Sequence, residues 1–137
     1  MKNYFSLSMP ERDINQISAL GLAHCGDAVF ELLVRSFLCD SGKLTTKQLH
    51  RETVQYVCAP AQAARADRML PLLTDDELAL YKRGRNAHTH MVPKNATHEQ
   101  YSKATGLECL FGALYLSGKL ERINELFVQT MEEPHAD

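Results

Sequence analysis

Apolar side chains recur along this chain at spacings of three and four residues, and they rarely alternate with polar ones. This spacing places apolar side chains on one face of an α-helix, whereas a half-buried strand would need strict alternation. Valine and isoleucine are sparse, and all five prolines fall where a periodic segment starts or stops. The pattern therefore predicts an all-α fold, a helical bundle without a β-sheet.

The periodic segments predict six helices. Two of them begin with capping boxes, at Thr74 and Thr97, in which a threonine and the Glu or Gln three residues later bond each other's backbone N–H groups. A polar loop is expected from about Gly84 to Ala96, and long loops in compact domains are often functional. The expected helices cover approximately residues 16–39, 45–57, 60–70, 74–84, 97–117 and 119–132.

Composition narrows the class of protein. The chain has 137 residues, 45% of them apolar, and a formal net charge of −2. This length predicts a single domain over residues 1–137, and the charge argues against a protein that coats nucleic acid through overall basicity. No apolar stretch is long enough to cross a membrane, and the first residues lack the apolar core of a signal peptide. The cysteines contain no C-x-x-C pair and are expected to be reduced core thiols of a cytoplasmic protein: Cys25, Cys39, Cys58 and Cys109.

Carboxylates interrupt the two most apolar segments of the chain. Asp27 and Glu31 are the only charges between residues 17 and 34, and Glu108 is the only one between residues 104 and 116. A buried carboxylate is costly unless a cation neutralises it. Glu31 has Arg35 four residues later, so a helix ion pair would account for it. Asp27 and Glu108 have no cation at helical spacing, which leaves a distant Lys or Arg or a metal ion as their partner.

The same two helices contain glycine in their interiors, where it costs about 1 kcal/mol relative to alanine. Gly26 precedes Asp27, and Gly112 lies one turn after Glu108. Small residues allow two helix backbones to approach closely, and such a crossing would bring Asp27 and Glu108 together. Carboxylates converging from two helices favour a hard cation such as Mg²⁺ or Mn²⁺.

Positive charge is concentrated between Lys82 and Lys94, where no acidic residue occurs. Cations beside a carboxylate site suit a phosphodiester substrate, because they fix the backbone while a metal acts at the reacting phosphate. A solvated basic loop is the simpler alternative. His88 and His90 lack a third nearby ligand, so a zinc site here is weakly supported.

These residues resemble the ribonuclease III family. CGDAVFELLV (25–34) is similar to the signature helix of its catalytic domain, and TGLECLFGALYL (105–116) is similar to its second metal-binding helix. The loop RGRNAHTHMVPKN (83–95), and the expected absence of a double-stranded-RNA-binding domain, resemble the short branch called Mini-ribonuclease III. Asp27 and Glu108 match two of the family's four acidic positions, whereas Ala23 and Thr105 stand at the other two.

The resemblance implies a Mg²⁺-dependent endoribonuclease, with Mn²⁺ as a substitute, that cuts double-stranded RNA as a homodimer. It implies 5′-phosphate and 3′-hydroxyl ends and a role in maturing the precursor of large-subunit (23S) ribosomal RNA in the cytoplasm. Asp27 and Glu108 would be the catalytic metal ligands, and Glu31 is a further candidate. Six residues are expected to contact RNA: Lys82, Arg83, Arg85, Asn86, Lys94 and Asn95. Two alternatives stay open, a non-catalytic RNA- or protein-binding scaffold and a helical dimerisation module, although the latter leaves both carboxylates unexplained.

Overall fold

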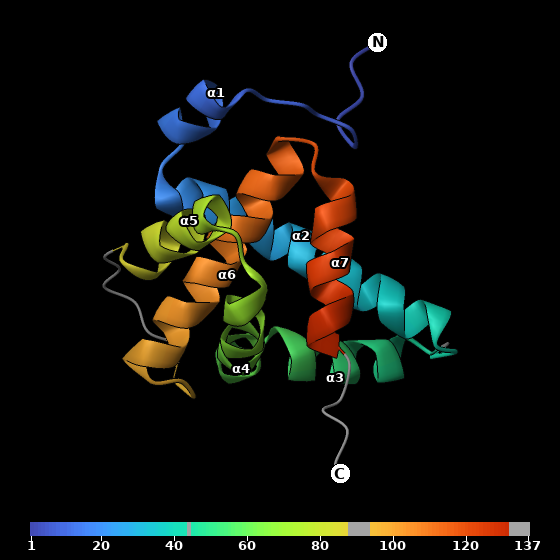
Figure 1. Cartoon of the computed structure of the whole chain (residues 1–137). Coiled ribbons are helices and arrows are strands. Elements are labelled where there is room, and N and C mark those ends of the chain that lie inside the picture. Colours follow the sequence, from blue (N-terminus) through green and yellow to red (C-terminus); the bar gives the residue numbers. More distant parts are fainter. Residues whose placement is uncertain (44, 88–93, 132–137) are drawn as a thin grey trace.

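The computed structural model describes residues 1–43, 45–87 and 94–131. Within them the chain is helical and contains no strand, which confirms the predicted all-α class (Figure 1). A short 3₁₀ turn, Leu70–Leu72, follows the fourth helix. The α-helices are α1 (Glu11–Gln16), α2 (Ala19–Asp40), α3 (Thr46–Val57), α4 (Ala59–Met69), α5 (Asp75–Arg85), α6 (His98–Leu116) and α7 (Leu120–Met131).

Local capping explains where the helices begin. Both predicted capping boxes are present: Thr74 accepts from the N–H of Glu77 at 3.2 Å, and Thr97 accepts from the N–H of Gln100 at 3.1 Å. In each box the Glu or Gln side chain bonds the threonine N–H in return. Ser18 caps α2 by accepting from the N–H of Gly21 at 2.9 Å. These bonds satisfy N–H groups that a helix leaves without internal partners.

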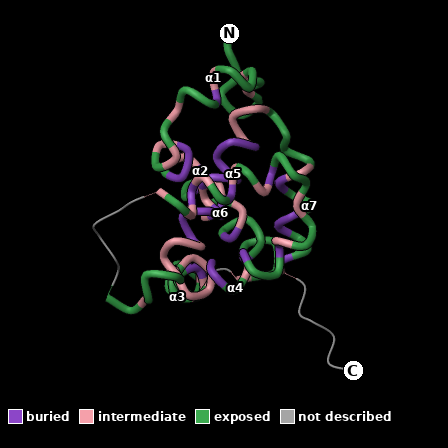
Figure 2. The backbone as a smooth tube through the Cα atoms, turned by 60° about the vertical axis from the view of Figure 1, so that its left-hand side comes forward, coloured by how far each residue is buried: buried purple, intermediate pink, exposed green. Residues whose placement is uncertain are grey.

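Helix α6 forms the centre of the bundle, and α2, α4, α5 and α7 pack around it (Figure 1). Three apolar side chains in its middle are completely buried: Leu107, Leu110 and Phe111 are all at 0% exposure. Phe111 meets Phe30 of α2 edge to face, with 5.9 Å between the ring centroids. Figure 2 shows the buried positions gathered along α6 and the helices around it. The core therefore fixes α2 and α6, the two helices that carry the unexplained carboxylates, against each other.

The start of α2 differs from the prediction of one helix from residue 16. A separate helix, α1, ends at Gln16, and the backbone is extended at Ile17 and Ser18 before α2 begins. The sequence pattern missed α1 because six residues are too few to show a helical period. The short helix begins directly after Pro10, whose fixed backbone angle suits the residue before a helix start.

The basic segment also differs from the prediction, because α5 continues to Arg85 and Gly84 is a buried helical residue. A Cβ on Gly84 would lie 2.4 Å from the Cβ of Cys109. Glycine here therefore allows close packing of α5 on α6, although in the sequence it resembles the start of a loop. Residues 88–93 of the predicted loop, with His88 and His90, lie outside the described residues, as does Glu132 at the predicted end of the last helix.

The four cysteines are free thiols, as expected. Cys109 is buried and Cys25 is half-buried, but Cys39 and Cys58 are exposed, so the prediction of four core thiols is wrong for the last two. In the described part of the chain, no helix is long and apolar enough to cross a membrane.

Candidate active site

Two glycines bring the backbones of α2 and α6 into contact. A Cβ built on Gly26 would lie 1.6 Å from the carbonyl oxygen of Glu108, and one built on Gly112 would lie 2.0 Å from the carbonyl oxygen of Leu22. No side chain fits either position without separating the helices, so the predicted close crossing is confirmed. Because Asp27 follows Gly26 directly, the crossing places its carboxylate beside that of Glu108.

Asp27 and Glu108 are hydrogen-bonded to each other through their side chains. Burial, this hydrogen bond and the neighbouring charge of Asp27 together raise the pKa of Glu108 to about 9. A carboxyl with so high a pKa is protonated at neutral pH when no cation is near. The two side chains therefore share a proton in the place where a divalent cation would satisfy both.

The donor set of this pair fits a hard cation. Mg²⁺ prefers carboxylate oxygens, keeps several waters, and is commonly held by one or two carboxylates together with substrate phosphates. Within residues 1–43, 45–87 and 94–131 there is no group of three or more His, Cys, Asp or Glu side chains that could hold a metal. Asp27 and Glu108 thus form a two-carboxylate site that leaves positions for water and substrate.

The prediction that both carboxylates are buried is wrong for Asp27. Asp27 is exposed and Glu108 is partly buried, so the pair lies where the crossing opens to solvent. Exposure of Asp27 makes the site accessible to a substrate as large as an RNA duplex.

The other two acidic positions of the family's pattern, occupied here by Ala23 and Thr105, contribute no carboxylate to this site. Ala23 is buried at 7% exposure and packs in the core with Cys109 and Ala113. Thr105 is buried at 5%, and its hydroxyl donates to the backbone oxygen of Tyr101 at 3.0 Å. Neither side chain therefore supplies a carboxylate, and both are buried.

Glu31, the third candidate ligand, pairs with Arg35 one turn further along α2. The distance from its Oε2 to the Nη2 of Arg35 is 3.0 Å. This is the helix ion pair that the spacing had offered as one explanation for Glu31.

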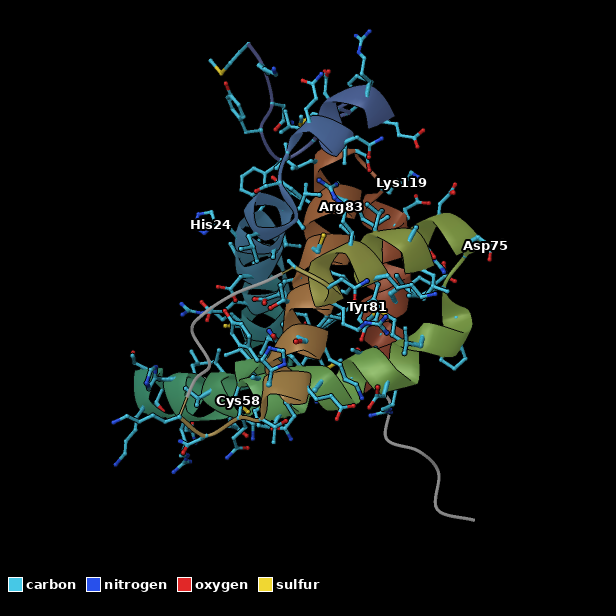
Figure 3. The ribbon with its side chains drawn as sticks, turned by 90° about the vertical axis from the view of Figure 1, so that its left-hand side faces the viewer. His24, Cys58, Asp75, Tyr81, Arg83 and Lys119 are labelled. Atoms are coloured by element: carbon cyan, nitrogen blue, oxygen red, sulfur yellow. The ribbon has the colours of Figure 1, made fainter. Side chains whose placement is uncertain are left out.

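The basic residues at the end of α5 have different surroundings. Arg83 is partly buried and donates through its Nη2 to the backbone oxygen of Ile17, which ties α5 to the start of α2 (Figure 3). Arg85 lies over the ring of Tyr81, 5.9 Å from the centroid, and its Nε donates to Asn86 at 3.4 Å. Lys82 is exposed.

Helix α5, which carries these cations, packs on α6, the helix that carries Glu108. Gly84 contacts α6 between Thr105 and Cys109, the residues that bracket Glu108 in sequence. Lys94 and Asn95 are exposed. Of the expected RNA contacts, Arg83 is therefore bonded to a distant backbone segment at Ile17, whereas Arg85 contacts Tyr81 and Asn86 at the end of its own helix.

An apolar groove on the outer face of α2 was not located by the sequence analysis. It has a volume of about 560 Å³ and is lined in part by Phe5, Ala28, Leu32, Leu33, Tyr115 and Leu120. Leu32 is 56% exposed and Phe5 is 75% exposed. The only signal in the sequence is that α2 is apolar on more than one face, which a buried helix would show as well.

Comparison with known proteins gives consistent matches. Residues 20–119 match the family described as "Ribonuclease III domain". A protein of Enterococcus faecalis named Mini-ribonuclease 3 is 44% identical over 117 residues, covering 84% of this chain and 89% of that protein. A protein of the same name from Symbiobacterium thermophilum is also 44% identical, over 107 residues. A crystal structure of a Fusobacterium nucleatum protein superposes with a TM-score of 0.76 at 31% identity, covering 85% of this chain and 93% of that one.

Proposed function

Because this chain belongs to the ribonuclease III family, we propose that Asp27 and Glu108 form the hydrolytic site with which it cleaves double-stranded RNA. The chain is an endoribonuclease of this family, with residues 1–137 as its catalytic domain. The observation that carries the assignment of the site is the hydrogen bond between the two carboxylates at a glycine-lined crossing of α2 and α6.

Asp27 and Glu108 are the residues that would hold Mg²⁺, with Mn²⁺ as a substitute. When bound, the ion supplies positive charge against the negative charge that develops on the phosphate during in-line attack by water. Glu108 must lose its proton before it can bind the ion, and the solvent-exposed Asp27 gives that proton a path to water. The rigid crossing keeps both carboxylates in one geometry, so that little reorganisation is needed during the reaction.

The basic residues at the end of α5 and after it in sequence would hold the RNA backbone. Lys82 and Arg85 lie at the end of α5, which packs on α6 at Cys109, and Lys94 and Asn95 follow residues 88–93 in sequence. Asn86 follows the last residue of α5, and its side-chain oxygen accepts a hydrogen bond from Arg85. The two side chains would therefore contact the RNA together. Duplex RNA is recognised mostly through its shape, phosphates and 2′-hydroxyls, which suits a small rigid surface of this kind. Arg83 contributes by fixing α5 in place.

A homodimer is the assembly that best accounts for the apolar groove. Leu32 at 56% exposure and Leu120 at 41% lie in a groove with few polar groups, and exposed apolar patches of this kind mark interaction sites. A second copy is the occupant we propose, because cutting both strands of a duplex requires two sites and each chain supplies one pair of carboxylates. Substitution of Leu32 by Glu is expected to give monomers in sedimentation velocity.

The precursor of large-subunit (23S) ribosomal RNA in the cytoplasm is the substrate we propose. The support is the similarity to proteins named Mini-ribonuclease 3, together with the motifs of that branch in this sequence. The test is incubation of a duplex from this precursor, and of an unrelated duplex, with the protein in Mg²⁺ or EDTA. Staggered cuts in Mg²⁺ alone are expected. Binding without cleavage in both conditions would instead identify a scaffold that has lost two acidic positions.

A further inference from the structure

A second groove, about 340 Å³ in volume, lies between the C-terminal half of α2 and helix α3. The described residues that line this α2–α3 groove include two basic groups, Arg35 from α2 and His50 from α3, together with the hydroxyl-bearing Thr46. Lys47 and Arg51, next to these residues on α3, are exposed. The groove therefore combines donors and positive charge on two helices, which is a surface suited to an anion.

The α2–α3 groove lies on the same helix face as the carboxylate site. Asp27, Glu31 and Arg35 follow each other at four-residue intervals on α2, so their side chains form one line along its surface. Eight residues of helix correspond to about 12 Å. A distance of this size spans a few nucleotides of an RNA strand. A strand with one phosphate at Asp27 would thus pass the groove a few nucleotides away.

Arg35 is held in position without being neutralised completely. Its Nη2 pairs with the Oε2 of Glu31 at 3.0 Å, while 62% of its side chain remains exposed. A guanidinium has five N–H donors, so one ion pair leaves several for an anion in the groove. The same contact engages the Oε2 of Glu31 with a cation of the protein, which favours a role for Glu31 in holding Arg35.

We propose that Arg35 and His50 bind a phosphate of the RNA strand that lies across Asp27, and that Glu31 positions Arg35 and does not bind metal. The inference rests on the proposed function and adds a substrate contact away from the reacting phosphate. It also separates the roles of the three charged residues on this face of α2: Asp27 holds the metal, Arg35 holds the substrate, and Glu31 fixes Arg35.

Duplex binding in EDTA tests the substrate contact without cleavage. Substitution of Arg35 by Gln is expected to weaken binding about tenfold, and to lower the slope of log Kd against log salt concentration by about one for each copy that contacts the duplex. His50→Gln should weaken binding in the same direction. Arg12→Gln is the control, because it removes an even more exposed arginine from α1 (83% of its side chain); it should leave the slope within about 0.3 of wild type.

The role of Glu31 is tested by its effect on the metal. At saturating RNA, Glu31→Gln is expected to leave the Mg²⁺ concentration that gives half-maximal cleavage within twofold of wild type. A rise of tenfold or more would identify Glu31 as a metal ligand and overturn its positioning role. Circular dichroism of each variant confirms the helical fold.

The outcomes separate this inference from the proposed function. If the wild type cleaves duplex RNA in Mg²⁺ while Arg35→Gln and His50→Gln bind it with unchanged affinity and salt slope, the phosphate contact is wrong and the enzyme assignment stands. If the wild type neither binds nor cleaves duplex RNA, the proposed function is wrong and the inference is wrong with it.

Discussion

Substitution of Gly26 by Ala tests whether the close crossing of α2 and α6 creates the site. The new Cβ would lie 1.6 Å from the carbonyl oxygen of Glu108 and 2.7 Å from the backbone nitrogen of Gly112. Ordinary contact needs about 3.5 Å, so the two backbones must separate by about 2 Å. Both obstacles are backbone atoms of a buried helix, which cannot rotate aside as a side chain can.

The expected cost follows from opposing effects. Alanine is the better helix former by about 1 kcal/mol. Against this, overpacking a core costs about 1–3 kcal/mol and occasionally more, and here the strain falls on the central helix pair. Because both obstacles are backbone atoms, we expect an overpacking cost of about 4 kcal/mol, above the usual range, and therefore a net loss of about 3 kcal/mol in the free energy of unfolding. This corresponds to a fall in Tm of about 10 °C for a chain of this size. The separated carboxylates should also cleave duplex RNA at least a hundredfold more slowly.

Urea denaturation and a cleavage assay measure the two effects. Gly21→Ala is the matched control on the same helix, since its Cβ would meet side-chain atoms of Ile17 and Ser18 at 3.0 Å and no backbone. It should change stability by less than about 1 kcal/mol. The reasoning is refuted if Gly26→Ala is as stable and as active as Gly21→Ala.

Three further predictions concern pH, metal binding and an ion pair. The pKa of Glu108 is raised from 4.5 to about 9 in the metal-free fold. Between these pH values the folded protein therefore holds a proton on Glu108 that the unfolded chain has lost. The free energy of unfolding in EDTA should consequently fall as pH rises from 6 to 8. The Glu108→Gln variant cannot titrate at this position and is the reference. Over this pH range the free energy of unfolding of the wild type should fall by about 1–2 kcal/mol more than that of the variant, after solvent screening, and equal pH dependence of the two proteins would contradict the prediction. Mg²⁺ binding near pH 7.5 should release about one proton from Glu108. Titration calorimetry in buffers of different ionisation enthalpy measures this release. If no proton is released, the Glu108 carboxyl is already ionised and the prediction is wrong. Arg122→Gln should destabilise the protein by about 2 kcal/mol in urea, because its guanidinium bonds both oxygens of the largely buried Glu77 at 2.8 Å. The exposed partner offers a control: Glu125→Gln should cost less than about 0.5 kcal/mol, and equal costs would refute the distinction.

The sequence was sufficient for features that depend on local spacing. Capping boxes at Thr74 and Thr97 depend on residues three apart, and both are present in the structure. The meeting of Asp27 and Glu108 was also predictable, because interior glycines cost helix stability and therefore indicate a close helix crossing. Family membership followed from the same two motifs.

Features that depend on distant contacts were not predictable. Arg83 bonds the backbone of Ile17, 66 residues away in sequence, and nothing in its neighbours distinguishes it from the RNA-binding cations. Gly84 resembles a loop residue until its contact with Cys109 on α6 is known. The exposure of Asp27 depends on which side of the crossing opens to solvent, and apolar periodicity on α2 alone does not give it.

The central claim is that Asp27 and Glu108 together form the cleavage site. The most direct test is single-turnover cleavage of duplex RNA at saturating Mg²⁺ by the wild type, Asp27→Asn, Glu108→Gln and the double variant, with the exposed Asp40→Asn on the same helix as control. We predict that each single variant loses at least about a thousandfold in rate, that the double variant loses little more, and that duplex affinity in EDTA stays within threefold of wild type. Cleavage by Asp27→Asn within tenfold of the wild-type rate would contradict the account.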